Sequence, residues 1–144
     1  ETIRDLIDSK IIIYYGLVKG KTSSDLPKNA NLLLIVTHPD RTTAVSIKIF
    51  EYLYSNRPIL ALTDRTVVSN IVKETNSGWV IHPFDRKKII KFLYDFITRP
   101  EIGESIIQNK RKISQYSFEK QFRHLDKILK NLNKKDKIQE LINA

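Results

Sequence analysis

The chain has 144 residues, of which 41% are hydrophobic and 28% are charged, an ordinary composition for one folded domain with its own core. It contains no Cys, which excludes disulfides and thiolate metal sites, and no apolar stretch approaches the roughly 18 residues of a membrane span. The net charge is +9, and residues 108–144 hold 10 basic and 4 acidic side chains. Such a basic tail suits nucleic acid, an anionic membrane surface or a phosphorylated ligand, or it is a solvated helix face.

The first elements in chain order are a short helix, a strand, a turn region and a second strand. Helix spacing at residues 3–7 precedes the apolar run 11–15, which predicts a buried strand ended by Gly16. The polar segment 19–31 predicts turns and at most a short helix. The run 32–36 predicts the next strand.

A loop at residues 37–43 then leads into a helix at 46–54, and residues 59–62 predict a third strand. The helix pattern places three side chains on one side, those of Ile47, Phe50 and Tyr54. A further helix at 67–74 is expected to end where Gly78 supplies a left-handed cap.

Residues 79–81 predict a fourth strand, and Asp85 is a predicted N-cap for a helix at 86–97. The residues of this helix expected to face inward are Ile89, Ile90, Leu93 and Phe96. No later strand pattern follows. The remainder predicts helices at 101–113 and at 117–132, the second capped by Ser117, and then a last short helix or frayed tail at 134–144.

Strands that alternate with helices predict an α/β fold, a Rossmann-like three-layer domain with a mostly parallel sheet and extra C-terminal helices. In such sheets ligands bind outside the carboxyl ends of the strands. The segments to consider for function are therefore the loops that follow each predicted strand.

The helix after the 32–36 strand carries the most informative pair. Lys48 and Glu51 are three residues apart and share a helix face. The N–H groups and positive dipole end of a helix favour a phosphate, and a carboxylate one turn further in can accept hydrogen bonds from two vicinal hydroxyls of a ribose. The alternative interpretation is an exposed ion pair of little energetic value.

The same segment resembles the donor-site helix of the family-four-like (group 1) retaining glycosyltransferases, which have the GT-B fold. Matching residues are Lys48, the run Ile49-Phe50-Glu51-Tyr52-Leu53 and the run Pro58-Ile59-Leu60-Ala61, with Ser55-Asn56-Arg57 in place of the usual small-Gly-Lys turn. Further landmarks fall in the family's order, at Tyr15-Gly16-Leu17-Val18, Asn29-Ala30-Asn31-Leu32-Leu33-Leu34, Asn76-Ser77-Gly78-Trp79-Val80 and Tyr116-Ser117-Phe118. The resemblance covers residues 11–130.

The resemblance implies a role for each matching position. Glu51 would bind the ribose hydroxyls, and Lys48 with the backbone of Thr43, Ala44, Val45 and Ser46 would serve the diphosphate. Gly16, Leu17 and Val18 would flank the base. Many family members carry a second Glu eight positions before the ribose-binding one, where this chain has Thr43. His38, Arg41, Thr42 and Thr43 are the candidates to replace its contact with the transferred sugar.

The resemblance also implies one half of a GT-B enzyme, the nucleotide-sugar-binding C-terminal domain, with the N-terminal acceptor domain absent. A chain that begins at Glu1 and has no Met fits a fragment of this kind. The implied activity is transfer of a sugar, with retention, from a UDP-hexose or UDP-N-acetylhexosamine to a lipid-linked glycan in O-antigen or capsule biosynthesis, in the bacterial cytoplasm or at the inner face of the membrane. No metal or other cofactor is expected, and the isolated domain would bind donor without turnover.

Two other functions stay open. One is a GT-B nucleotide-sugar epimerase or hydrolase, whose acid and base groups would come from a preceding domain. The other is a basic, non-catalytic nucleic-acid-binding module, although aromatic residues are not interleaved with the basic ones as a stacking surface requires, so nucleic acid is not the expected partner. An apolar stripe, formed by Phe122, Leu125, Ile128, Leu129 and Leu132, is expected to pack against the rest of the fold, with an anionic membrane as the alternative.

Overall fold

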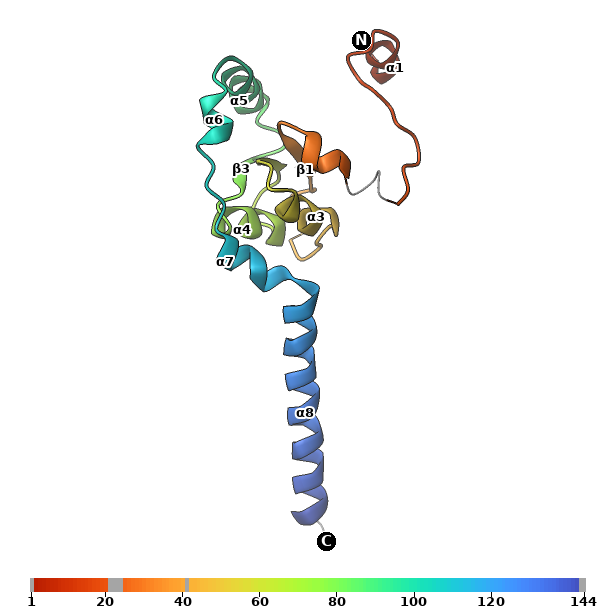
Figure 1. Cartoon of the computed structure of the whole chain (residues 1–144), viewed down its shortest axis with the longest axis vertical. Coiled ribbons are helices and arrows are strands. Elements are labelled where there is room, and N and C mark those ends of the chain that lie inside the picture. Colours follow the sequence, from red (N-terminus) through yellow and green to blue (C-terminus); the bar gives the residue numbers. More distant parts are fainter. Residues whose placement is uncertain (1, 21–24, 41, 143–144) are drawn as a thin grey trace.

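The computed structural model of the chain describes residues 2–20, 25–40 and 42–142, the last ten of them as backbone only. Its elements in order are α1 (Ile3–Asp8), the 3-10 helix η1 (Leu26–Asn29), β1 (Leu33–Val36), α3 (Lys48–Ser55), β2 (Ile59–Leu62), α4 (Val67–Glu74), β3 (Gly78–Ile81), α5 (Arg86–Thr98), α6 (Glu101–Glu104), α7 (Lys110–Ile113), the 3-10 helix η2 (Ser114–Tyr116) and α8 (Phe118–Ile142) (Figure 1).

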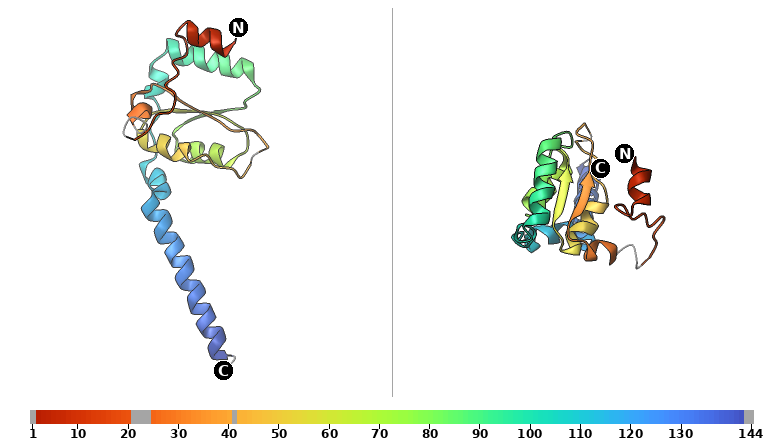
Figure 2. Two further views of the ribbon diagram at one scale, coloured as in Figure 1. Left: turned by 90° about the vertical axis from the view of Figure 1, so that its right-hand side faces the viewer. Right: turned by 90° about the horizontal axis from the view of Figure 1, so that it is seen from above.

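The described strands form one parallel sheet in the order β1-β2-β3. Helices α3 and α4 cover one face of this sheet and α5 lies on the other, which gives three layers (Figure 2). The predicted α/β fold class is therefore confirmed, with an all-parallel sheet, the architecture of a small Rossmann-like domain. Because each strand runs in the same direction, the strand ends at Val36, Leu62 and Ile81 lie along one edge of the sheet.

The core lies between the sheet and helices α3 and α4. Leu33 and Ile35 of β1 face Ile49 and Leu53 of α3, all at most 6% exposed. The burial of Ile49 and Leu53 corrects the helix face predicted from Ile47, Phe50 and Tyr54. Residues 49 and 53 are one turn apart and take the core side, which leaves Ile47 and Tyr54 74% and 55% exposed.

The opposite sheet face is covered by α5 through an aromatic cluster. The ring of Trp79 on β3 lies 4.9 Å from that of Phe92 and 5.9 Å from that of Phe96. The prediction for α5 was right for Ile89 and Phe96, which are half-buried, and wrong for Ile90 and Leu93, which are exposed. The helix reaches only part of this face, so the side chains of Leu34 and Val36 on β1 also stay exposed.

Residues 11–15 do not form the predicted strand. The side chains of Ile11, Ile13, Tyr14 and Tyr15 are each at least 63% exposed, on an arm that stands apart from the sheet (Figure 1). The run has the composition of a buried strand, but a strand is defined by hydrogen bonds to a neighbour. Within the described residues the sheet contains β1, β2 and β3 only.

The turn between α4 and β3 uses its glycine differently from the prediction. The left-handed residue is Asn76, with φ 47°, and not Gly78. Gly78 instead opens β3, where a Cβ atom would lie 1.8 Å from the backbone oxygen of Ile59 on the neighbouring strand. A side chain at residue 78 would thus collide with β2 whatever its rotamer.

The C-terminal part contains α6, α7 and α8, and the prediction of one helix at 101–113 was wrong. Residues 105–109 run between α6 and α7 and are fastened to the α4–β3 turn, since the Asn109 N–H donates to the Thr75 oxygen at 2.8 Å and the Asn76 side-chain amide donates to the Ile107 oxygen at 2.8 Å. Asp85 caps α5 and Ser117 caps α8 as predicted, through the N–H groups of Lys88 and Lys120.

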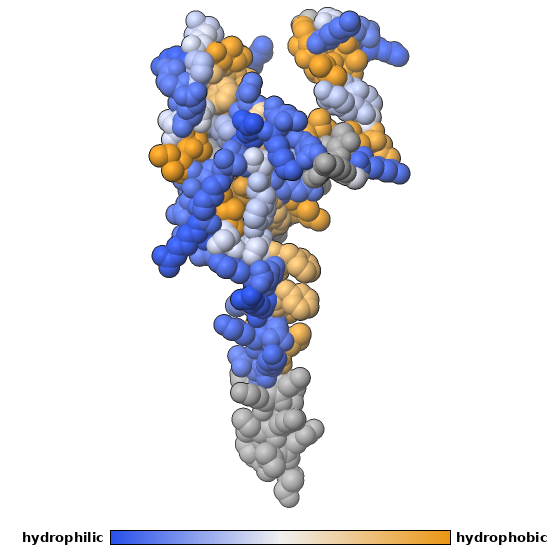
Figure 3. Space-filling model, in the orientation of Figure 1, coloured by the Kyte–Doolittle hydropathy of each residue, from blue (hydrophilic) through white to orange (hydrophobic). Residues whose placement is uncertain are grey.

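Helix α8 extends away from the body, and its apolar stripe is exposed along one side (Figures 1 and 3). The five side chains of the stripe are 44% to 60% exposed: Phe122, Leu125, Ile128, Leu129 and Leu132. The expectation that they pack against the rest of the fold is therefore wrong for this structure, because α8 touches the body only near its start. None of the helices in the described part of the chain combines the length and apolar character needed to cross a bilayer.

Candidate functional site

A crevice of about 620 Å³ lies at the carboxyl end of β1, where the rule for parallel sheets places a ligand. Its lining residues are Val36, Thr37, His38, Asp40, Ala44, Val45 and Ser46. Two backbone hydrogen bonds fix the loop around it, from the Thr37 N–H to the Leu62 oxygen at 3.1 Å and from the Val67 N–H to the Thr42 oxygen at 3.1 Å. The loop that begins α3 is thereby tied to the second strand and to α4.

Helix α3 begins at this crevice. The first N–H groups of a helix have no partner within the helix, and in α3 the N-cap is Ile47, which has no side-chain acceptor to offer them. The Lys48 N–H meets the Ser46 hydroxyl oxygen at 3.4 Å, a long contact. The N–H groups of Ile49 and Phe50 already donate to the Ser46 and Ile47 oxygens at 3.1 Å, so an anion in the crevice would accept hydrogen bonds from the N–H groups before them.

Lys48 and Glu51 form an ion pair on the exposed side of α3. The Lys48 ammonium lies 2.8 Å from a Glu51 carboxylate oxygen, and both side chains are about half exposed, 54% and 45%. The hydrogen bond that the Lys48 ammonium donates to Glu51, and after it the negative charge of that carboxylate, raise the pKa of Lys48 above its ordinary value. A pair this open to water contributes little to stability, so both charges remain accessible to a ligand.

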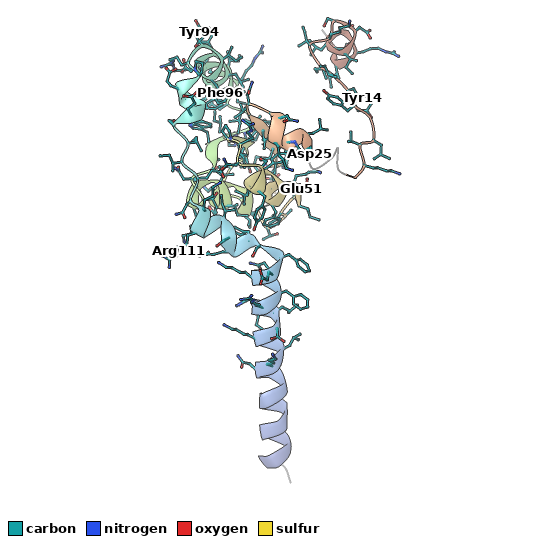
Figure 4. All side chains as sticks on the ribbon, in the orientation of Figure 1. Tyr14, Asp25, Glu51, Tyr94, Phe96 and Arg111 are labelled. Atoms are coloured by element: carbon teal, nitrogen blue, oxygen red, sulfur yellow. The ribbon has the colours of Figure 1, made fainter. Side chains whose placement is uncertain are left out.

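A second, larger cleft of about 1010 Å³ lies along the outer side of α3. Glu51 lines it, on the helix against which η1 packs (Figure 4). The other lining residues are Gly20, Pro27, Lys28, Val45, Phe50, Tyr54, Ser55, Val67, Ile71, Tyr116, Phe118 and Gln121. Val45 lines both hollows, so the crevice at β1 and the cleft beside Glu51 adjoin at one side chain.

The structure brings together most, but not all, of the predicted site residues. Ala44, Val45 and Ser46 line the crevice and Glu51 lines the cleft, while Lys48 lines neither hollow and is connected to the site by its ion pair with Glu51. Thr43 is exposed in the loop and lines neither hollow.

Gly16, Leu17 and Val18, predicted to flank the base, lie on the N-terminal arm and line neither hollow. Gly16 has φ +65°, and Leu17 is 84% exposed. These residues directly follow residues 11–15, the predicted strand that pairs with no other described strand. Gly20, two residues after Val18, does line the larger cleft with Glu51, so the arm approaches the cleft while these three residues lie outside its lining.

The candidates to replace the missing Glu have different environments. His38 lines the crevice, and its Nδ1 accepts a hydrogen bond from the Asp40 N–H at 3.3 Å. Thr42 contributes its carbonyl oxygen to the Val67 hydrogen bond. Arg41 lies outside the described residues. Of these side chains, that of His38 is the one placed in the crevice.

Sequence reasoning missed the aromatic wall of the larger cleft. Tyr54 was assigned to an apolar helix face and Phe118 only to the family landmark Tyr116-Ser117-Phe118, yet both line the cleft with Glu51. The usable signal was the spacing of Tyr54 from Glu51, three residues along one helix. Nothing in the local sequence indicated that Phe118, more than sixty residues later, would meet them.

The described residues hold no cluster of three or more His, Cys, Asp or Glu side chains suited to a metal ion. The fold and the two hollows thus define a Rossmann-like α/β domain with a concave surface at the end of its first described strand. Comparison with protein-family models, with curated proteins and with solved structures gives no match. The resemblance to glycosyltransferases rests on the sequence motifs alone.

Proposed function

We propose that this chain is the donor-binding domain of a retaining glycosyltransferase and binds a nucleoside diphosphate sugar. One observation carries the proposal. Glu51, the residue that the resemblance assigns to the ribose, lines a large cleft that adjoins the crevice at the end of β1 through Val45. The places for a diphosphate and for a ribose are therefore contiguous.

The diphosphate would lie in the crevice, at the amino end of α3. The backbone N–H groups of residues 44–48 and the Lys48 ammonium supply donors and positive charge to its oxygens. A phosphate oxygen can replace Glu51 as the partner of the Lys48 ammonium, because the ion pair is exposed and contributes little to stability by itself. Breaking this pair leaves both Glu51 carboxylate oxygens available to the two ribose hydroxyls.

Transfer requires a second partner. In the proposed reaction the bond between the sugar and the diphosphate breaks, and a bond to an acceptor hydroxyl oxygen forms on the same face of the sugar. The acceptor, a lipid-linked glycan, would be held by an N-terminal domain, since alignment of the two reactants is much of the catalysis. This chain by itself is proposed to bind the donor without turnover.

Membrane association is part of the same proposal and is supported by α8. One side of this helix exposes the five apolar side chains of the stripe, while Lys120, Arg123, Lys127 and Lys130 lie on its other side. Helices of this type lie in the interface of anionic bilayers. Arg123 and Lys130 pair with Glu119 and Asp126, which reduces the charge available to lipid and makes weak, salt-sensitive binding the expectation.

The proposal is tested by ligand-observed NMR and calorimetry with UDP, GDP and ADP. We expect at least one of these nucleotides to bind in the millimolar range or tighter, and Glu51→Ala to weaken its binding about tenfold, because a hydrogen bond to a charged group is worth about 1.5–3 kcal/mol. Absence of binding by all three, or equal binding by the variant, would refute the assignment. Strongly salt-dependent binding to DNA or RNA without nucleotide binding would favour the nucleic-acid alternative.

A further inference from the structure

The larger cleft contains more aromatic surface than the fold itself needs. Phe118 is 83% exposed and Tyr54 is 55% exposed, so neither ring packs into the core. They come from different elements, α3 and the start of α8, and both line the cleft into which Glu51 faces. Exposed aromatic rings beside a carboxylate are a suitable surface for a ligand that has a flat, apolar part next to a diol.

A fixed wall supports this surface. Tyr116 lies between α7 and α8, its ring 5.8 Å from that of Phe50, and its hydroxyl donates a hydrogen bond to the carboxylate of Glu74 on α4. These contacts hold the start of α8 against α3 and α4. They fix where α8 begins, and the Phe118 ring stacks on that of Phe122 one turn further along the helix, at 5.9 Å.

The spacing along α3 gives the surface an order. Lys48, Glu51 and Tyr54 follow one another at intervals of three residues, each step about 4.5 Å along the helix axis, on neighbouring parts of one face. Phosphate, ribose and base are joined in this same order in a nucleotide. A nucleotide with its phosphates at the amino end of α3 and its ribose at Glu51 would place its base beside Tyr54.

We infer that Tyr54 and Phe118 bind the nucleobase of the donor by stacking, an inference that rests on the proposed function of Glu51. The predicted base-binding residues Gly16, Leu17 and Val18 lie on the separate arm, so the aromatic pair takes over the role assigned to them. Gln121, which lines the same cleft, is held by a hydrogen bond from its side-chain amide to the Gln115 oxygen at 2.8 Å and has further donor and acceptor capacity for the edge of the base.

Uridine 5′-monophosphate and ribose 5-phosphate test the inference, because the base is the main difference between them. Base stacking on aromatic side chains is worth about 1–3 kcal/mol, so the nucleotide should bind at least about fivefold more tightly to the native chain. Tyr54→Leu and Phe118→Leu should each weaken the binding of uridine 5′-monophosphate alone. The ratio of its affinity to that of ribose 5-phosphate should then be close to one. In saturation-transfer NMR, the base protons H5 and H6 should receive the strongest signal.

Tyr94→Leu is the matched control, since Tyr94 is 67% exposed on α5 and lines neither hollow. It should leave the ratio unchanged. If Glu51→Gln weakens both ligands while Tyr54→Leu and Phe118→Leu leave the ratio intact, the base lies elsewhere and the inference alone fails. If the native chain binds none of UDP, GDP and ADP, the inference and the proposed function fail together.

Discussion

The Lys48 ammonium lies 2.8 Å from a carboxylate oxygen of Glu51, one turn into the helix that begins at the crevice of β1. The two charges neutralise each other, with Glu51 on the wall of the larger cleft. In the proposed complex each charge exchanges this partner for a part of the ligand, the ammonium for phosphate and the carboxylate for ribose.

Replacement of Lys48 by Met should weaken the binding of a nucleoside diphosphate about tenfold and reduce its salt dependence, because one cation beside the phosphates is lost. Calorimetry at low and high salt measures both effects. Lys88→Met is the control, since Lys88 forms an equivalent ion pair with Asp85 at 2.8 Å on α5. Equal losses in the two variants would show that only overall charge matters.

Replacement of Gly78 by Ala should destabilise the fold by about 3 kcal/mol or more, because the added Cβ would lie 1.8 Å from the Ile59 backbone oxygen and would push β3 away from β2. Urea denaturation followed by circular dichroism measures the loss. Gly16→Ala is the comparison. Gly16 has φ +65° and open space around it, so this change should cost only about 1–2 kcal/mol. Similar values for the two variants would contradict the close approach at residue 78.

The start of α5 should lose stability in acid. Hydrogen bonds from the Lys88 side chain and backbone lower the pKa of Asp85 below its usual 3.8. A carboxyl whose pKa falls on folding contributes stability above its unfolded value, and this contribution disappears as the pH drops through the folded value. Asp85→Asn, which keeps a capping side chain without the charge, should therefore lower Tm at pH 7 and lower it less at pH 2. An equal difference at both pH values would contradict the role of the charge.

The apolar stripe of α8 should mediate binding to vesicles that contain phosphatidylglycerol. Leu125→Glu with Leu129→Glu should abolish co-sedimentation, because both side chains are about half exposed on the stripe. The control is His124→Glu with Asn131→Glu, which adds two acidic groups to the same helix away from the stripe. If both double variants lose co-sedimentation equally, the added negative charge, and not the apolar stripe, explains the loss. Binding that neither variant changes would exclude α8 as the membrane contact.

Much of the fold follows from local patterns, and the failures occur where a distant partner decides. The apolar runs at 32–36 and 11–15 look alike, yet only the first finds a neighbouring strand, through its pairing with β2. Gly78 was correctly singled out, but its actual constraint is the Ile59 backbone nineteen residues earlier, which no local turn rule reveals.

In the candidate site too, contacts within one helix could be predicted from the sequence and contacts between distant elements could not. Glu51 and Lys48 share a face because they are three residues apart on one helix, and the structure confirms their contact. The meeting of Glu51 with Phe118 depends instead on how the start of α8 packs against α3 and α4. Sequence spacing contains no information about that packing.

The central claim is that the Glu51 carboxylate binds the two hydroxyls of a ribose, and a comparison of UDP with its 2′,3′-dideoxy analogue tests it most directly. The native chain should bind UDP about tenfold more tightly than the analogue. Glu51→Gln should bind the two ligands with nearly equal affinity. The effects of the substitution and of removing the ribose hydroxyls would then be non-additive, as expected for groups in direct contact. A preference for UDP that is the same in the native chain and in Glu51→Gln would contradict the account.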